Sequence, residues 1–160
     1  MPVTELILLR HAHAEAGKPG QDDIDRPLSL QGQAEAEAAG RWLRDHGYVP
    51  DRVVRSTARR ARETCERALA ELGYVEQRED ARIYDATPGR PLEVADDHRE
   101  LARVLLIGHN PGFEQLVALL SSGQSGDFRG MPAGGIAVLS VPADAALEPG
   151  VASLAAFWWP

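Results

Sequence analysis

The chain has little cysteine, no long apolar run and no excess of positive charge, and each shortage excludes a class of protein. Its single cysteine, Cys65, excludes an internal disulfide and fits a reducing compartment. The apolar run at residues 6–9 is too short to span a membrane. It also lacks the basic segment and the cleavage site of a signal peptide. These absences predict a cytoplasmic protein.

The net charge of −7 gives no electrostatic support for binding nucleic acid or an anionic membrane, so neither partner is expected. A phosphate site in so acidic a chain would need a local cluster of arginines. The 160 residues contain no internal repeat, no low-complexity tract and no linker, which predicts one domain over residues 1–160.

Strands and helices are expected to alternate along the chain. The continuous apolar runs at residues 6–9 and 104–107 are typical of strands covered on both faces. Further strands are expected at residues 52–55, 81–84, 136–141 and 151–157. The order predicts an α/β fold, a three-layer α/β/α sandwich around a mainly parallel sheet.

The helices are placed by their caps and apolar stripes. Residues 17–27, rich in Gly, Pro and Asp, are expected to form a surface loop. The expected helices are one capped by Ser29 that ends near His46, one capped by Ser56 or Thr57 that ends at Leu72, a short one over residues 91–101, and one capped by Asn110. Cys65 falls on the apolar stripe of the second helix and is expected in the core.

Two arginines and two histidines fall at or just after the carboxyl ends of three expected strands. Arg10 and His11 end the first, Arg60 follows the second, and His109 ends the strand at residues 104–107. Ligands of open α/β sheets bind at these strand ends. Arginine suits phosphate because its planar guanidinium makes paired hydrogen bonds and stays protonated. A neutral imidazole can attack phosphorus, so the four residues are sufficient for phosphoryl transfer.

Four segments make this interpretation more specific. They are LILLRHAHAEA at 6–16, RPLSLQG at 26–32, STARRARET at 56–64 and VLLIGHNPG at 104–112. In this order they resemble the motifs of the histidine phosphatase superfamily, which is phosphoglycerate-mutase-like. The resemblance implies that His11 is the nucleophile, that Arg10 and Arg60 bind the phosphoryl group, and that His109 is a second catalytic histidine. Arg26 is a candidate substrate contact, and Arg59 is the alternative to Arg60.

The short size and the Gly-His-Asn-Pro-Gly segment resemble the SixA-type phosphohistidine phosphatases most. This resemblance implies a phosphohistidine-bearing protein, such as a phosphotransfer domain, as the substrate, and no cofactor. Thr57 stands where the family usually has proline. Related enzymes acting on alkyl phosphates carry an acidic proton donor, and Asp85 in the segment IYDATPG is the only candidate for it here.

Other interpretations stay open beside this one. A small phosphorylated metabolite is the alternative substrate, and a non-catalytic phosphate-binding module is the alternative from another class. The pair His11 and His13 also has the spacing of some metal sites, but Arg10 would repel a cation, so no metal is expected. His13, His46 and His98 are expected at the surface.

Overall fold

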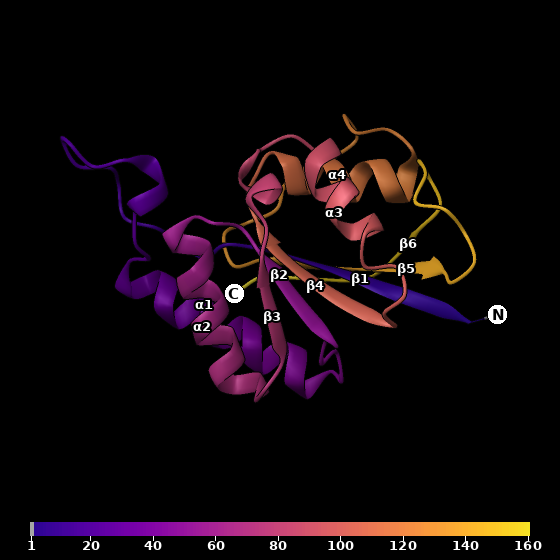
Figure 1. The fold of residues 1–160 in the computed structure, drawn as a ribbon, viewed down its shortest axis with the longest axis horizontal. Coiled ribbons are helices and arrows are strands. Elements are labelled where there is room, and N and C mark those ends of the chain that lie inside the picture. The colour runs from indigo at the N-terminus through magenta and orange to yellow at the C-terminus, as the bar shows by residue number, and fades with distance from the viewer. Residues whose placement is uncertain (1) are drawn as a thin grey trace.

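The computed structural model describes residues 2–160, which form a six-stranded sheet between two layers of helices (Figure 1). The strand order is β3-β2-β4-β1-β5-β6. The strands are β1 (Val3–Arg10), β2 (Arg52–Arg55), β3 (Glu76–Glu79), β4 (Arg103–Gly108), β5 (Ile136–Pro142) and β6 (Ser153–Trp158). The helices are α1 (Leu30–Asp45), α2 (Arg59–Leu72), α3 (Gly89–Asp96) and α4 (Gly112–Ser122).

The sheet is parallel in one part and antiparallel in the other. Strands β3, β2, β4 and β1 run parallel to one another, whereas β5 and β6 join as antiparallel strands at the other side. Parallel neighbours place their carboxyl ends at one edge of the sheet. The mainly parallel α/β sheet expected from the sequence is therefore confirmed.

Both faces of the sheet are buried, as the continuous apolar runs predict. In β1, Leu6 and Leu8 join the core beneath α3 and α4, while Ile7 and Leu9 join the core beneath α1 and α2. Figure 1 shows these two helix pairs on opposite sides of the sheet. Alternate side chains of a strand point to opposite faces, so a run of four apolar residues supplies both cores. Cys65 is fully buried in the second core, as expected.

The prediction of a strand at residues 81–84 is wrong. These residues form a 3-10 helix, η2 (Ala81–Tyr84), and the strand lies earlier, at β3. Its sequence, Glu-Gln-Arg-Glu, has no apolar alternation, because β3 is an edge strand with mostly exposed side chains. Pairing with β2 holds it in the sheet, which is a tertiary interaction without a local signal.

Several helix starts and ends also differ from the expectation. Helix α2 has Ala58 as its N-cap residue rather than Ser56 or Thr57, and α3 runs from Gly89 to Asp96 instead of over residues 91–101. The N-cap residue of α4 is Pro111, although the Oδ1 atom of Asn110 does accept the backbone N–H of Glu114. The prediction that His98 lies at the surface is also wrong, because its side chain is buried.

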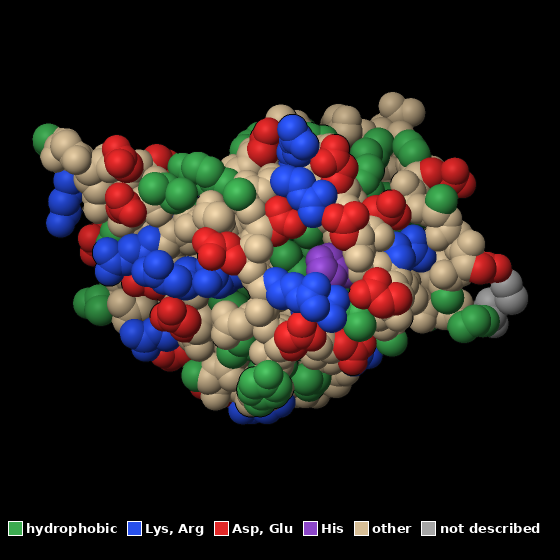
Figure 2. Space-filling model, in the orientation of Figure 1, with side chains coloured by type: hydrophobic (Ala, Val, Ile, Leu, Met, Phe, Trp, Pro, Cys, Tyr) green, Lys and Arg blue, Asp and Glu red, His purple; other side chains and the backbone are tan. Residues whose placement is uncertain are grey.

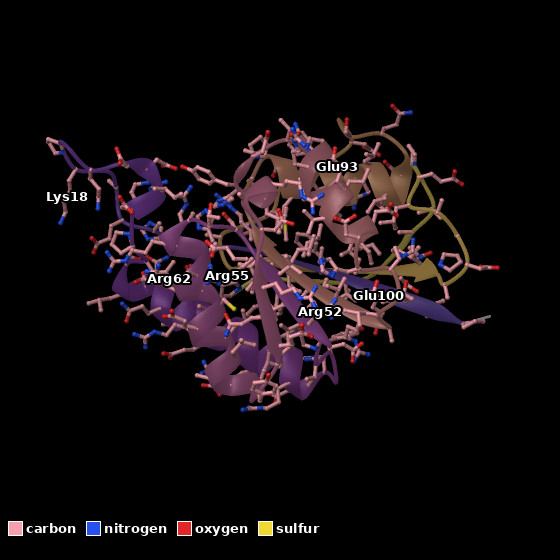
Figure 3. All side chains as sticks on the ribbon, in the orientation of Figure 1. Lys18, Arg52, Arg55, Arg62, Glu93 and Glu100 are labelled. Carbon is pink, nitrogen blue, oxygen red and sulfur yellow. The ribbon has the colours of Figure 1, made fainter. Side chains whose placement is uncertain are left out.

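The loop expected at residues 17–27 projects from one end of the molecule, with Lys18 near its tip (Figure 3). It contains a single turn of 3-10 helix, η1 (Asp23–Asp25). Over residues 2–160 we find no helix that combines the length and apolarity needed to cross a membrane.

Candidate active site

The carboxyl ends of β1, β2 and β4 meet at one edge of the sheet. Arg10 of β1 pairs with Gly108 of β4, and Arg55 of β2 pairs with Ile107. The next residues continue this contact, since His11 donates its backbone N–H to the Gly108 carbonyl over 2.9 Å. The register of the sheet therefore brings segments from three distant parts of the chain together.

A cavity of about 500 Å³ lies at this edge. Arg10, His11, Arg60 and His109, the four residues singled out from the sequence, all line it. The remaining lining residues are His13, Ala14, Asp23, Arg26, Tyr84, Ala86, Asn110 and Ala133. Three arginines against one carboxylate make the cavity a basic site in an acidic chain.

The ring of His11 is held in one tautomer. Its Nδ1 atom lies 2.7 Å from the carbonyl oxygen of Ala12, which can only accept, so Nδ1 carries the proton. The other ring nitrogen, Nε2, then has a free lone pair. Burial lowers the pKa of His11 to about 4, and the charges of Arg60 and Arg10 act in the same direction. The imidazole is therefore neutral at physiological pH, which is the nucleophilic form.

His109 lies beside His11, with 5.1 Å between the ring centroids. Its Nε2 atom is 2.7 Å from the hydroxyl oxygen of Ser56, which also accepts the backbone N–H of Ala58. The hydroxyl proton of Ser56 can thus be directed at Nε2, which leaves the proton of a neutral His109 on Nδ1. Burial lowers the pKa of His109 to about 3, and the neighbouring His11 and Arg60 add to this effect.

Three buried nitrogens of the cavity have no hydrogen-bond partner among residues 2–160. They are Nε of Arg10, Nε of Arg60 and Nδ1 of His109. An unpartnered buried donor costs free energy, and such groups usually have a partner in the functioning protein. Nε of Arg52 and of Arg55, outside the cavity, is unpartnered over the same residues as well, so it is the grouping of these three nitrogens in residues that line one cavity beside His11 that points to an oxyanion.

Arg60 is anchored through its terminal nitrogens by Asp23, another residue of the cavity. Its Nη1 atom donates to the Asp23 carbonyl over 2.9 Å, and Nη2 donates to Oδ2 of the same residue over 3.1 Å. Tyr84 donates its hydroxyl to that Oδ2 atom, and the guanidinium lies 5.9 Å from the centre of the Tyr84 ring. Asp23 and Tyr84 therefore hold the terminal nitrogens of Arg60, whereas Nε has no partner within residues 2–160.

The segment around Arg60 also holds the loop that carries His11. The hydroxyl of Thr64 accepts the backbone N–H of Ala12 over 3.1 Å, and Glu63 accepts that of Leu28 over 2.8 Å. Arg59 faces away, paired with Glu63 at the surface. Of the two arginines that compete for the motif position, Arg60 is buried in the cavity and Arg59 is not.

Arg26 and Asp85 have different positions. Arg26 lines the cavity, where its Nε atom donates to Asp23 and its Nη1 atom to the carbonyl of Glu15. Asp85 is exposed and absent from the cavity lining. Its carboxylate accepts the backbone N–H of Thr87, and hydrogen bonds from the side chain and the backbone of Thr87 lower the pKa of Asp85. A proton donor needs a raised pKa, so these observations speak against Asp85 in that role.

Sequence reasoning missed Asp23 and Tyr84, and it treated Ser56 only as a helix cap. Asp23 lies in a loop whose composition indicated nothing beyond exposure. Tyr84 is adjacent to Asp85 in the segment that the sequence did identify, but the 3-10 turn of η2 directs Tyr84 into the cavity. No local pattern distinguishes the two side chains. Ser56 opens the arginine motif, and that position was the one available signal.

Glycine at position 108 is required by the packing behind the site. A Cβ atom there would lie 2.6 Å from Ile83 and 2.7 Å from the ring of Phe113. Both side chains are buried in the core beneath α3 and α4. The residue before His109 therefore has to lack a side chain for η2 and α4 to pack against the end of β4.

We find no group of three or more His, Cys, Asp or Glu side chains over residues 2–160 with the arrangement of a metal site.

Comparison with known proteins agrees with this geometry. The family model of the histidine phosphatase superfamily (branch 1) matches residues 6–103. An uncharacterized protein of Mycobacterium tuberculosis is 38% identical, covering 92% of this chain and 98% of its own. A crystal structure of a candidate phosphohistidine phosphatase SixA from Agrobacterium tumefaciens has a TM-score of 0.85 at 30% identity, covering 100% of this chain and 99% of that one.

A second solved structure, of a candidate phosphohistidine phosphatase SixA from Nakamurella multipartitia, has a TM-score of 0.82 at 34% identity and covers 100% of this chain and 98% of that one. The matched family segment holds the Arg-His and second arginine motifs, and the structural matches extend over the whole chain. The chain therefore belongs to the histidine phosphatase superfamily and is a phosphatase.

Proposed function

We propose that this protein is a phosphohistidine phosphatase that removes the phosphoryl group from a phosphohistidine-bearing protein through a phospho-His11 intermediate. The two SixA structures with at least 30% identity carry that activity in their names, and the whole chain aligns with them. The scheme requires no metal or organic cofactor. The buried free thiol of Cys65 suits the reducing cytoplasm, where we expect the enzyme to act.

In the first step, the lone pair on Nε2 of His11 attacks phosphorus in line with the scissile P–N bond. A new N–P bond forms at His11, and the electron pair of the broken bond remains on the substrate imidazole. That imidazole leaves as a neutral ring because its other nitrogen already carries a proton. Arg10, Arg60 and His109 donate to the phosphoryl oxygens through the nitrogens that are otherwise unpartnered.

In the second step, water attacks the phosphorus of phospho-His11. The P–N bond to His11 breaks, and its electron pair returns to Nε2. Inorganic phosphate leaves, taking up the oxygen of the water. A phosphoryl dianion near His109 favours the protonated form of that ring, so the neutral His109 of the free cavity can gain a proton when substrate binds.

The observation that favours a P–N substrate is the state of the carboxylate in the cavity. Among the residues that line it, Asp23 is the single carboxylic acid. Hydrogen bonds from Tyr84, Arg60 and Arg26 hold the pKa of Asp23 at about 2, so it is ionised and cannot donate a proton. An alkoxide leaving group needs a proton, which general acid catalysis supplies for about 10²–10⁴-fold in rate. A phosphorylated imidazole whose other nitrogen carries a proton leaves as the neutral ring without that help.

One observation supports a small phosphate ester as the alternative substrate. The hydroxyl of Tyr84 lines the cavity, and its interaction with Asp23 raises the pKa of Tyr84, which keeps the proton on the oxygen. This group could protonate an ester oxygen if it left Asp23. A non-catalytic module is disfavoured because His11 keeps its neutral ring and its free Nε2 atom.

A panel assay tests the proposal. Wild type, His11→Ala, Tyr84→Phe and Asp85→Asn are compared on a phosphohistidine phosphotransfer domain, on free phosphohistidine and on sugar phosphates. We expect rapid P–N hydrolysis by wild type, none by His11→Ala with unchanged thermal unfolding, and about the wild-type rate by Asp85→Asn. Radiolabelled substrate should leave an acid-labile label on His11. Rapid ester turnover that Tyr84→Phe or Asp85→Asn reduces a hundredfold would establish the metabolite phosphatase instead.

A further inference from the structure

A second, apolar cavity lies next to the catalytic one. This groove has a volume of about 630 Å³ and lies between α4, the loop at residues 127–132, and β6 with the residue that follows it, Trp159. Val117, Phe128, Leu154, Phe157 and Trp159 supply its apolar lining. Three of these are well exposed, Phe128 at 44%, Leu154 at 44% and Trp159 at 56%. Contiguous exposed apolar side chains on a soluble protein usually mark an interaction site.

The groove and the catalytic cavity share one wall, the segment at residues 130–134. Pro132 lines the groove, and the next residue, Ala133, lines the catalytic cavity. Gly134 then donates its backbone N–H to the carbonyls of Arg10 and His11. The carbonyl of Met131 accepts a hydrogen bond from Nη1 of Arg10. A partner bound in the groove therefore contacts the same loop that supports the catalytic residues.

A second connection runs through the start of α4. Asn110 lines the catalytic cavity, and its side-chain amide donates to Glu114, which lines the groove. From Glu114 the groove continues along α4 to Ser122, a distance of about 12 Å at 1.5 Å per helical residue. This length matches about two turns of a partner helix. Figure 1 also shows that the C-terminus lies toward the end of the sheet where β1 ends, away from the N-terminus.

We propose that this groove docks the helix of the substrate protein that carries the phosphohistidine, by receiving apolar side chains one to two turns away from it. The inference rests on the proposed function and adds the surface that selects a protein substrate. An amphipathic helix laid in an apolar groove, with anchors at positions i+3, i+4 and i+7, is an established mode of recognition. A single phosphoryl group fills only part of the catalytic cavity, and free phosphohistidine would leave the groove empty.

The test uses exposed groove residues that lie outside the catalytic cavity. The variants Phe128→Ser and Leu154→Ser, singly and together, are compared with Tyr74→Ser as a matched control. Tyr74 is 97% exposed and lines neither the groove nor the catalytic cavity. Two substrates are used, a helical phosphotransfer domain with one phosphohistidine and free phosphohistidine. Thermal unfolding verifies that each variant is folded.

We expect the double variant to lower kcat/KM for the phosphotransfer domain by about tenfold or more, mainly through KM, because anchors in apolar pockets dominate binding. Turnover of free phosphohistidine should stay within about twofold of wild type, and Tyr74→Ser should change neither. Equal losses on both substrates, or no loss on either, would overturn the inference.

Two further outcomes have a definite meaning. If the groove variants convert a dimer to a monomer in sedimentation while domain turnover stays unchanged, the groove is a contact between copies of this chain, and the inference is wrong. If wild type fails to act on the phosphotransfer domain but hydrolyses esters, the proposed function fails together with the groove. Wild-type turnover of the domain with unaffected groove variants rejects the groove alone.

Discussion

Buried or half-buried arginines lie at both ends of the parallel strands. The two ends differ in how many carboxylates pair with these arginines. At the amino ends, Arg103 of β4 donates to Glu5 of β1 and to the Val49 carbonyl, and Arg52 of β2 pairs with Glu76 and Glu100. Figure 3 shows Arg52 and Glu100 side by side. Across the face of Figure 2, acidic and basic side chains are likewise intermixed.

At the carboxyl ends, by contrast, positive charge exceeds negative charge. Arg10, Arg26 and Arg60 share the cavity with one carboxylate, Asp23, whereas Arg52 alone has two, Glu76 and Glu100, although its Nε atom also lacks a hydrogen-bond partner within residues 2–160. Burying a charge without a partner is costly, so such an arrangement persists where a ligand completes it. An excess of cations over carboxylates, rather than cations as such, therefore indicates the anion site.

The largest expected effect on activity comes from removing one arginine at each end of the strands and comparing the two variants. Arg60→Ala should lower kcat/KM by about 10²–10³-fold, because it removes donors from the transition state. Arg103→Ala should leave kcat/KM unchanged but lower the free energy of unfolding by about 1 kcal/mol, as expected for a partly buried ion pair. Arg59→Ala is the control within the motif and should change neither.

These three variants are measured by steady-state kinetics and by urea unfolding. Loss of activity in Arg59→Ala with retention in Arg60→Ala would reverse the assignment of the motif arginine. An activity loss in Arg103→Ala as large as that in Arg60→Ala would remove the distinction between the two ends.

Acid should lower the free energy of unfolding through buried histidines at both ends of the strands. Added phosphate should restore only the part that comes from the histidines of the cavity. Burial lowers the pKa of His11 to about 4 and of His109 to about 3, and burial beside Arg52 also lowers the pKa of His98 at the amino end. The unfolded histidines titrate near 6.5 and therefore bind more protons than the folded ones below that pH. Stability is thus full above about pH 6.5 and falls as the pH is lowered toward 4.

For His11 alone the loss between pH 7 and pH 5 should be on the order of 2 kcal/mol. Urea unfolding at both pH values measures it. Inorganic phosphate should restore part of the loss in wild type and in His98→Gln, because a bound anion favours the protonated forms of His11 and His109. Arg60→Ala should lose this rescue. Equal rescue in Arg60→Ala would mean that phosphate acts on the whole protein rather than at the cavity.

The smallest effect concerns the partner of His109. Ser56→Ala removes the hydroxyl that contacts Nε2 of His109 and should lower kcat by about fivefold to tenfold, consistent with the loss of one buried hydrogen bond. The protonated ring loses an acceptor, so its pKa in the enzyme–substrate complex falls. The alkaline limb of the kcat profile should then move to lower pH. A uniform fall in kcat at every pH would show that Ser56 acts only through packing.

The sequence alone was sufficient for the elements and residues that carry local patterns. Continuous apolar runs predicted β1 and β4, helical spacing predicted α2, and the arginine and histidine motifs predicted a shared site for Arg10, His11, Arg60 and His109, which line one cavity. Each signal lies within one short segment of the chain. The four residues converge because a parallel sheet places the carboxyl ends of its strands at one edge, a rule that the order of elements already implies.

The tertiary structure decided what has no local pattern. Asp23 meets Arg60 across 37 positions in the sequence, and only the folding of its loop onto α2 creates that contact. The 3-10 turn of η2 brings Tyr84 rather than Asp85 into the cavity, and pairing with β2 makes a strand of the charged segment β3. Burial and unpartnered nitrogens arise from packing over long sequence distances, so the neutral state of His11 and the free donors around it were decided by the fold.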